Sequence, residues 1–197
     1  MKKIAFACSV ILLLLACKEQ KSTGNPQVVI ETQFGDITLE LYVDKAPKTA
    51  TAFLNYVDSG WYERANFYRV LHNDNQPSNA PKSYLIQGGI WKSNNELAQR
   101  VKGIPHESTQ QTGLKHDVGI VSMARAEPGT AGTEFFICLD REPGFDYGGE
   151  NITDKQGFAA FAQVIKGMHI VRKIYEQRER NQYFEPPVMI FSIKRKK

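Results

Sequence analysis

Short runs of apolar residues, some of them alternating with polar residues, recur along most of this chain between polar or Gly- and Pro-containing segments. Runs of this length and pattern predict β-strands rather than helices. The strands that we expect are a hairpin at 28–42 that turns at 34–36, and single strands at 66–71, 84–87, 120–124, 135–137, 158–164 and 188–194. Many short strands predict a barrel or a sandwich.

Helical spacing occurs in two segments. Residues 48–59 carry an apolar face, and Pro47 just before them is typical of the first turn of a helix. The residues of this face are Ala50, Phe53, Leu54 and Val57. A second, shorter amphipathic helix is expected at 168–177, whereas 91–107 is expected to be irregular. The polar stretch 72–83 is longer than a hairpin loop needs, which makes it either functional or mobile.

The N-terminus has the pattern of a signal peptide. Two lysines precede an apolar run, 4–15, that is too short to span a membrane. Leu14-Leu15-Ala16-Cys17 resembles the lipobox of bacterial lipoproteins, in which the cysteine is lipidated and becomes the new N-terminus. We therefore expect residues 1–16 to be removed as a signal peptide and Cys17 to be lipidated. The alternative is a plain secretory peptide that contains a chance cysteine.

A lipidated Cys17 would hold the protein at the bacterial cell envelope, on the periplasmic side or at the outer membrane. Acyl chains contribute about 0.8 kcal/mol per buried CH₂, so that more than one chain gives a firm anchor. Residues 17–27, the lipidated cysteine and a polar stretch without periodicity, are expected to form a tether. The folded domain is then expected to span 28–197.

The composition is that of one globular domain. Of the 197 residues, 42% are hydrophobic and 23% are charged, which suits one well-buried core rather than two full domains. The formal net charge of +4 is too small to indicate a nucleic-acid-binding protein.

The cysteines and histidines do not indicate an internal disulfide or a metal site. Cys8 lies in the expected signal peptide and Cys17 is expected to be lipidated, which leaves Cys138 alone in a strand pattern, where we expect a buried, inert thiol. The histidines lack the spacing of metal ligands and are expected at the surface. They are His72, His106, His116 and His169. The sequence also lacks the GxSxG, P-loop and GxGxxG motifs.

Several short motifs follow one another along the chain. They are Lys45-Ala-Pro-Lys-Thr49 ahead of the first helix, Phe67-Tyr-Arg-Val-Leu71, Gln87-Gly-Gly89, Ser122-Met-Ala-Arg125 and Thr133-Glu-Phe-Phe-Ile137. Their order and approximate spacing resemble those of the cyclophilin peptidyl-prolyl isomerases, and the resemblance extends from Val28 to Lys194.

The resemblance implies a mainly β fold, a closed eight-stranded antiparallel barrel capped by two α-helices, with the active groove on its outer surface. It implies an enzyme that speeds cis/trans isomerisation of the bond before proline and needs no metal or cofactor. The expected partners are proline-containing unfolded or extended polypeptides among exported proteins. We expect no nucleic-acid partner, contact with the membrane only through the N-terminal lipid, and a monomer.

Two polar residues are implied as catalytic. A lone strand arginine such as Arg69 is expected to point to solvent, but its apolar neighbours indicate that its guanidinium needs a partner. By the resemblance, Arg69 stands where cyclophilins carry their catalytic arginine, and Gln87 matches the glutamine that holds the arginine and the substrate backbone. From the residues alone, Gln87 could equally be a strand-end residue that satisfies nearby backbone groups.

The resemblance also implies a pocket for the proline ring and a strand for the peptide backbone. The pocket residues are Tyr84, Leu85, Phe136, Phe145 and Phe158, and the backbone partners are Ala124 and Arg125. From the residues alone, each aromatic side chain could instead belong to the core. We also hypothesise that the 72–83 loop borders the groove.

The chain departs from the common family pattern at positions in or near the groove, which are Tyr84, Arg125, Glu134 and Phe158. Arg125 and Glu134 are expected to place new charges there and to change the preference for the residue before proline. Two functional classes stay open. One is an active isomerase; the other is a proline-binding chaperone or scaffold module with little catalysis, which these charges and the long loop would support.

Overall fold

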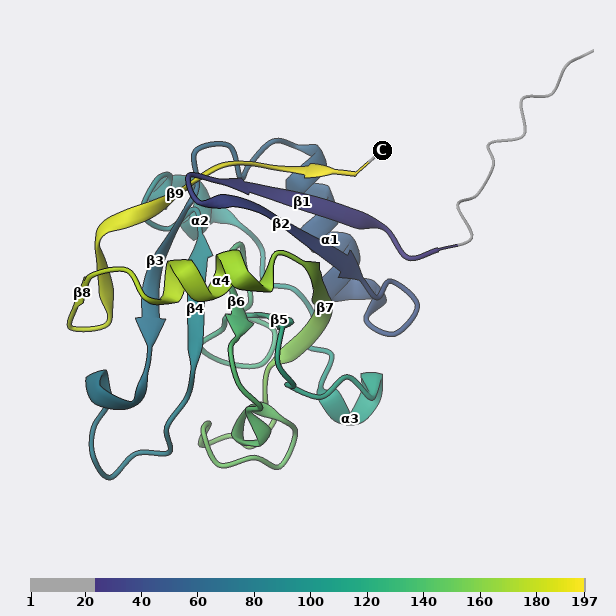
Figure 1. The fold of residues 1–197 in the computed structure, drawn as a ribbon. Helices are drawn as coiled ribbons and strands as arrows, with labels where there is room; N and C mark the ends of the chain where they lie inside the picture. Colours follow the sequence, from purple (N-terminus) through teal and green to yellow (C-terminus); the bar gives the residue numbers. More distant parts are fainter. Residues whose placement is uncertain (1–23, 197) are drawn as a thin grey trace, which may run out of the picture.

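Eight strands form a closed antiparallel barrel in the computed structural model, which describes residues 24–196 (Figure 1). Around the ring the order is β1-β2-β7-β5-β6-β4-β3-β9, and the pairing of β1 with β9 closes it. The strands are β1 (Gln27–Thr32), β2 (Gly35–Leu41), β3 (Asn66–Leu71), β4 (Leu85–Gly89), β5 (Ile120–Met123), β6 (Phe135–Cys138), β7 (Ala159–Lys166) and β9 (Tyr183–Arg195). A two-residue strand, β8 (Glu179–Arg180), pairs with β9. The predicted closed barrel is confirmed.

The two predicted helices are present as α1 (Pro47–Asp58) and α4 (Met168–Tyr175). Figure 1 shows α4 in front of the barrel and α1 behind it. Two short helices, α2 (Asn95–Arg100) and α3 (Thr109–Thr112), were not expected. The prediction that 91–107 is irregular is wrong at α2. Asn94 accepts a hydrogen bond from the backbone N–H of Leu97 (3.1 Å) and so caps the start of a helix.

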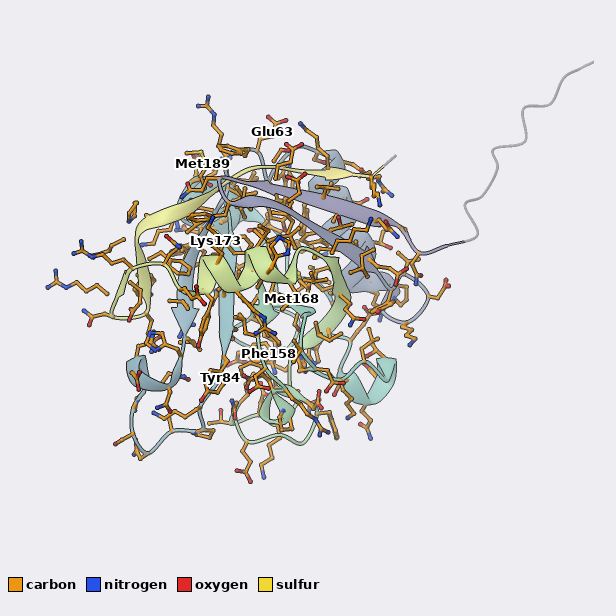
Figure 2. The ribbon with its side chains drawn as sticks, in the orientation of Figure 1. Glu63, Tyr84, Phe158, Met168, Lys173 and Met189 are labelled. Atoms are coloured by element: carbon orange, nitrogen blue, oxygen red, sulfur yellow. The ribbon has the colours of Figure 1, made fainter. Side chains whose placement is uncertain are left out.

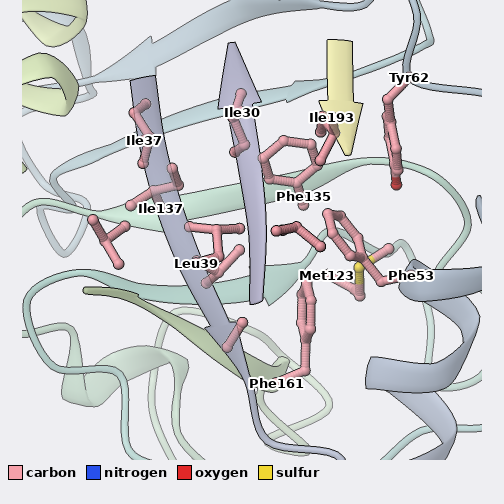
Figure 3. Packing of buried hydrophobic residues seen from close by; sticks show 14 of the residues in the cluster. Ile30, Ile37, Leu39, Phe53, Tyr62, Met123, Phe135, Ile137, Phe161 and Ile193 are labelled. Atoms are coloured by element: carbon pink, nitrogen blue, oxygen red, sulfur yellow. The ribbon is translucent and has the colours of Figure 1, made fainter. Parts of the chain in front are cut away.

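Apolar side chains from alternate strand positions fill the inside of the barrel (Figure 3). In β6, Phe135 and Ile137 belong to this core, whereas Phe136 and Cys138 lie on the outer face. This division follows because successive side chains of a strand point to opposite faces. Phe135 packs edge-on against Phe53 of α1, with ring centroids 5.6 Å apart. The barrel core thus leaves the outer face of β6 for a different use.

Some strand boundaries differ from the prediction. The first hairpin turns at Gln33 and Phe34, one residue earlier than expected, because Thr32 pairs with Gly35. The last strand begins at Tyr183 rather than at residue 188, because β9 pairs first with β3 and then with β1 along its length.

The predicted signal peptide and Cys17 lie outside the described residues. The first strand begins at Gln27, next to the predicted start of the folded domain. Within residues 24–196, no helix has both the length and the apolar character that a membrane span requires.

Candidate functional site

A row of paired residues crosses the outer face of β3, β4 and β6. Arg69 on β3 pairs with Gln87 on β4, and Gln87 pairs with Phe136 on β6. Val70 and Ile86, their neighbours in sequence, belong to the barrel core. Strand pairing therefore brings together three predicted site residues that lie far apart in the sequence.

An apolar cluster on this outer face is separate from the barrel core. We call it the groove floor, and it consists of Leu71, Leu85, Phe136, Cys138 and Phe145, with Ala124 and Phe158 packed against it. The rings of Phe136, Phe145 and Phe158 meet edge to face, with centroids 5.1 Å or 5.4 Å apart. Edge-to-face packing is the favoured aromatic geometry, so the three rings hold one another in place.

The groove floor, Arg69 and Gln87 line one hollow of about 360 Å³, which we call the groove. Its walls are the 72–83 loop and the loop between β6 and β7. The wall residues are Gln76, Ala80, Pro81, Ser83, Glu150 and Asn151. The two loops are tied together, because the side-chain amide of Asn151 donates a hydrogen bond to the Ser83 hydroxyl (2.8 Å). The hypothesis that the 72–83 loop borders the groove is confirmed.

Eight of the ten predicted catalytic and substrate-binding residues line this groove. They are Arg69, Leu85, Gln87, Ala124, Arg125, Phe136, Phe145 and Phe158. The other two, Tyr84 and Glu134, lie elsewhere, as described below.

The guanidinium of Arg69 is held along one edge and partly open along the other. Oε1 of Gln182 accepts hydrogen bonds from Nε (3.2 Å) and Nη2 (2.8 Å), and Oε1 of Gln87 accepts one from Nη1 (3.2 Å). These bonds use three of the five guanidinium N–H groups. The other two have no hydrogen-bond partner within residues 24–196. A half-buried cation with unused donors therefore borders an apolar floor.

Gln87 is held at both ends of its side-chain amide. Its oxygen accepts from Arg69, and its Nε2 donates a hydrogen bond to the hydroxyl of Tyr68 (2.9 Å). Burial, together with the nearby Glu134 carboxylate, raises the pKa of Tyr68 far above its usual range, so the hydroxyl keeps its proton. Gln87 is thus a fixed neutral acceptor beside Arg69.

Arg125 lines the groove, but its charge is satisfied within the protein. It donates two hydrogen bonds to the Asp154 carboxylate (2.7 and 3.0 Å) and two to the Gly157 carbonyl (3.0 and 2.6 Å). A fifth goes to the carbonyl of Ala126 (3.2 Å). All five N–H groups are therefore used, and the side chain is only 1% exposed.

Arg125 thus adds a charge to the lining of the groove, as expected, but this charge is paired with Asp154 and has no unused N–H group for a substrate. Its guanidinium lies 5.5 Å from the ring centroid of Phe158, on the groove floor. The hydrogen bonds from Arg125 lower the pKa of Asp154 to about 2. Arg125 fastens the loop between β6 and β7 to the end of β5, which positions Phe158.

Glu134 lies in a neighbouring hollow of about 280 Å³ that shares Gln87, Ala124 and Arg125 with the groove. Its Oε1 accepts hydrogen bonds from the backbone N–H groups of Ile90 (2.9 Å) and Trp91 (3.0 Å). Burial raises the pKa of this carboxyl group even though these bonds favour its ionised form. Glu134 thus holds the chain that leaves β4, beside the groove rather than inside it.

Tyr84 lines a different hollow, with Leu139, Arg172 and Tyr175. Figure 2 shows Tyr84 and Phe158 on the side of α4 that faces the two wall loops. Tyr84 is partly buried against the barrel core, whereas Leu85 belongs to the groove floor. Tyr84, the residue just before β4, therefore does not line the groove with the other implied pocket residues, because successive residues of an extended chain face opposite sides.

A buried polar trio behind the groove floor was missed by the sequence analysis. His116 is 1% exposed, so the expectation of a surface position is wrong. Its Nδ1 lies 2.8 Å from Oδ1 of Asp146, and its Nε2 lies 3.1 Å from the hydroxyl of Ser122. Burial alone would raise the pKa of Asp146, but the hydrogen bonds and charge of His116 hold it below its usual range.

Serine hydrolases use these three residue types as a catalytic triad. Here Ser122 is completely buried, so its hydroxyl cannot meet a substrate. The His116 ring instead stacks on Phe136, with centroids 6.1 Å apart, and supports the groove floor from behind. No local pattern could have revealed the trio, because Asp146 lies 30 positions from His116 in the sequence.

No set of three or more His, Cys, Asp or Glu side chains could hold a metal ion in the part of the chain that the structure describes. Cys138 is buried, and burial raises the pKa of its thiol well above the usual range. The expectation of an inert thiol at this position is confirmed.

Comparison with known proteins agrees with this geometry. The sequence model of a family described as cyclophilin type peptidyl-prolyl cis-trans isomerase/CLD matches residues 27–195. Peptidyl-prolyl cis-trans isomerase A of Dickeya dadantii is 30% identical over 182 residues, which cover 91% of this chain and 87% of the relative. Peptidyl-prolyl cis-trans isomerase B of Escherichia coli is 32% identical over 148 residues, 75% of this chain and 82% of the relative.

Among solved structures, a cyclophilin type peptidyl-prolyl cis-trans isomerase of Cryptosporidium parvum is similar, with a TM-score of 0.67. The alignment covers 87% of this chain and 98% of that one at 22% sequence identity. At this identity the likeness supports the barrel fold alone.

Proposed function

Because this chain belongs to the cyclophilin-type peptidyl-prolyl cis-trans isomerase family and is an isomerase of that class, we propose that Arg69 is its catalytic residue. One observation carries the proposal. Arg69 is a cation that retains unused N–H donors at the edge of an apolar groove floor. Its held edge fixes the guanidinium, while the donors on the open side can reach a bound peptide.

The chemistry needs one well-placed donor and no proton transfer. The partial double bond of the amide gives a rotation barrier of about 18–20 kcal/mol. As the bond before proline twists, resonance is lost and the prolyl nitrogen gains a lone pair. A fixed guanidinium N–H stabilises that lone pair more strongly than it stabilises the planar amide, which lowers the barrier. Lowering it by roughly 4 kcal/mol corresponds to about a thousandfold acceleration.

The groove floor is suited to the proline ring. A pyrrolidine ring is apolar and compact, and the edge-to-face rings of Phe136, Phe145 and Phe158 present a firm apolar surface beside Arg69. Burial of the ring on this surface would fix its position while the other half of the peptide bond rotates. Leu85 completes the same surface from β4.

The peptide backbone is proposed to lie along the end of β5. The Ala124 N–H is already donated to the Glu134 carbonyl (2.8 Å), so the carbonyl oxygen of Ala124 is the group that can serve a substrate. Gln87 holds Arg69 and can accept a second hydrogen bond from the substrate backbone through Oε1. The substrates proposed are proline-containing unfolded or extended segments of exported proteins, and the enzyme is proposed to act as a monomer without a metal or cofactor.

The proposed location is the bacterial cell envelope, through lipidation of Cys17 after removal of residues 1–16. The support is the Leu14-Leu15-Ala16-Cys17 pattern after a short apolar run. Cys17→Ser should move the protein from the membrane fraction to the soluble envelope fraction. Membrane association equal to that of the wild type would contradict the lipid anchor.

A protease-coupled assay on an X-Pro peptide tests the catalytic role of Arg69. Arg69→Ala should lower kcat/KM by about a thousandfold, while Arg141→Ala, which removes a side chain that is 76% exposed, should leave it unchanged. Wild-type activity in Arg69→Ala would refute the proposal. An inactive wild type that still binds the peptide would favour the proline-binding module instead.

A further inference from the structure

The two-residue turn between β8 and β9 has an unusual backbone. Arg180 pairs with Tyr183, so the turn residues are Asn181 and Gln182. Both have positive φ, 53° and 72°, as a type I′ hairpin turn requires. Asparagine is common at the first of these positions, but the second favours glycine, because a residue with a Cβ is strained there. Gln182 therefore occupies its position at a cost in conformational free energy.

The contacts of the Gln182 side chain explain why a glutamine, rather than a glycine, occupies this position. Its Oε1 accepts hydrogen bonds from both Nε (3.2 Å) and Nη2 (2.8 Å) of Arg69. A single acceptor that receives both N–H groups of one guanidinium edge restrains rotation of the planar group. The opposite edge then points Nη1 toward Gln87 and the groove.

The amide of Gln182 is held in one orientation. Its Nε2 donates a hydrogen bond to the backbone carbonyl of Asn75 (2.9 Å), in the 72–83 loop. A reversed amide would place its NH₂ group against the donors of Arg69 and its oxygen against that carbonyl. The orientation that serves Arg69 is therefore the only one that satisfies both partners.

The backbone of Gln182 is held as firmly as the side chain. Its N–H donates to the Glu179 carboxylate (2.7 Å), and its carbonyl accepts from the N–H of Val70 (2.8 Å), the residue that follows Arg69 on β3. Gln182 does not belong to the residues that line the groove. It can therefore act on the reaction only through Arg69 and the 72–83 loop.

We propose that Gln182 is a positioning residue that fixes the Arg69 guanidinium against the twisted bond, an inference that rests on the catalytic role of Arg69. In the free enzyme, the two hydrogen bonds from Arg69 to Gln182 hold the guanidinium in the geometry that the transition state needs. Without it, Arg69 must be ordered during each turnover, which lowers kcat. Peptide binding on the groove floor does not need this contact, so KM should change little.

The turn offers matched variants for the test. Gln182→Gly removes the amide but suits the positive φ, so it should fold at least as stably as the wild type. It should lower kcat by about tenfold and leave KM within about twofold. Asn181→Gly makes the same kind of change one residue away and should keep wild-type kcat. If Gln182→Gly does not fold, Gln182→Asn tolerates the turn and keeps the amide one methylene short of Arg69.

The outcomes separate this inference from the catalytic proposal. Both proposals are supported if Arg69→Ala is inactive and Gln182→Gly has a lowered kcat with a melting temperature at least as high as that of the wild type. Arg69→Ala inactive, with wild-type kcat in Gln182→Gly or in its substitute Gln182→Asn, overturns the positioning role alone. A loss that appears in KM rather than in kcat, or equally in Asn181→Gly, also overturns it. Full activity in Arg69→Ala refutes the catalytic proposal itself.

Discussion

Two arginines border the groove from opposite sides, and their surroundings differ. Arg125 gives all five N–H groups to protein oxygens, including a carboxylate, and its side chain is 1% exposed. Arg69 is half-buried, and within residues 24–196 its partners are neutral amides and two of its N–H donors stay unused. A charge in a groove is therefore available for chemistry only where the protein leaves its hydrogen-bonding capacity incomplete. Arg125 stabilises the loop between β6 and β7, whereas Arg69 keeps N–H donors that a substrate can use.

The largest predicted effect on stability concerns the floor between the two arginines. Phe136→Ala removes a ring that packs on Phe145, Phe158 and His116, and should lower the free energy of unfolding by about 3–5 kcal/mol. Denaturant unfolding measures this loss, and KM for an X-Pro peptide should rise. Phe191→Ala, at a phenylalanine that is 50% exposed, should cost less than about 0.5 kcal/mol. Equal losses in both variants would contradict a packed floor.

Removal of the other arginine should separate structure from catalysis. Arg125→Ala leaves the buried Gly157 carbonyl without its donors and should lower the free energy of unfolding by about 1–3 kcal/mol. Because Phe158 loses its support, KM should rise, while kcat stays within about threefold of the wild type. Steady-state kinetics and unfolding curves check this. A loss of kcat as large as that of Arg69→Ala, without a loss of stability, would remove the distinction between the two arginines.

Another buried ionisable group, the Glu142 carboxyl group, lies where the 72–83 loop enters β4. Glu142 accepts a hydrogen bond from the backbone N–H of Tyr84, and burial raises the pKa of Glu142 to about 7. A raised pKa favours the protonated form in the folded chain, so the stability it contributes is lost as the pH rises through about 7. Glu142→Gln keeps an acceptor for Tyr84 and should flatten the fall in melting temperature between pH 5 and pH 8. The same fall in the variant would contradict this assignment.

The smallest predicted effect concerns the stability that Asp154, the carboxylate partner of Arg125, contributes at low pH. The lowered pKa of Asp154 means that its carboxylate adds stability above its ordinary pKa of 3.8, and this stability is lost as the pH falls through about 2. Asp154→Asn should therefore reduce the loss of melting temperature between pH 4 and pH 2 slightly, since the carboxylate is exposed. Among the residues that the structure describes, no carboxylate pairs with Arg69, so this substitution should leave kcat at pH 7 unchanged. A large change in kcat would show that the two sides of the groove are coupled.

The sequence was sufficient for the elements whose physics is local or whose motif is specific. Strand 66–71 and the two longer helices followed from apolar spacing, and the spacing of the motifs indicated the barrel and most of the groove. The sequence did not determine which face of the sheet a side chain at a strand end lies on. Tyr84 and Leu85 are adjacent and both apolar in character, and only the register of β4 decides which one faces the groove.

Partners that come from distant segments were also beyond the sequence. Arg125 looked like an added groove charge because Asp154 lies 29 positions away, in a loop without periodicity. Gln182 looked like an ordinary polar residue, because its link to Arg69 spans 113 positions and depends on a two-residue turn after a two-residue strand. Such contacts cannot be predicted from local sequence patterns, because only the closed barrel brings these segments together.

Exchange spectroscopy by NMR on an X-Pro peptide at saturating enzyme measures the catalytic contribution of Arg69 itself, because it follows isomerisation of the bound peptide without a coupling protease. With wild-type protein, we expect rapid cis/trans exchange of the bound peptide. With Arg69→Ala, we expect the same peptide to bind with similar affinity but to exchange about a thousandfold more slowly. Exchange as fast as in the wild type would show that the groove floor alone catalyses rotation and that Arg69 is not the catalytic group.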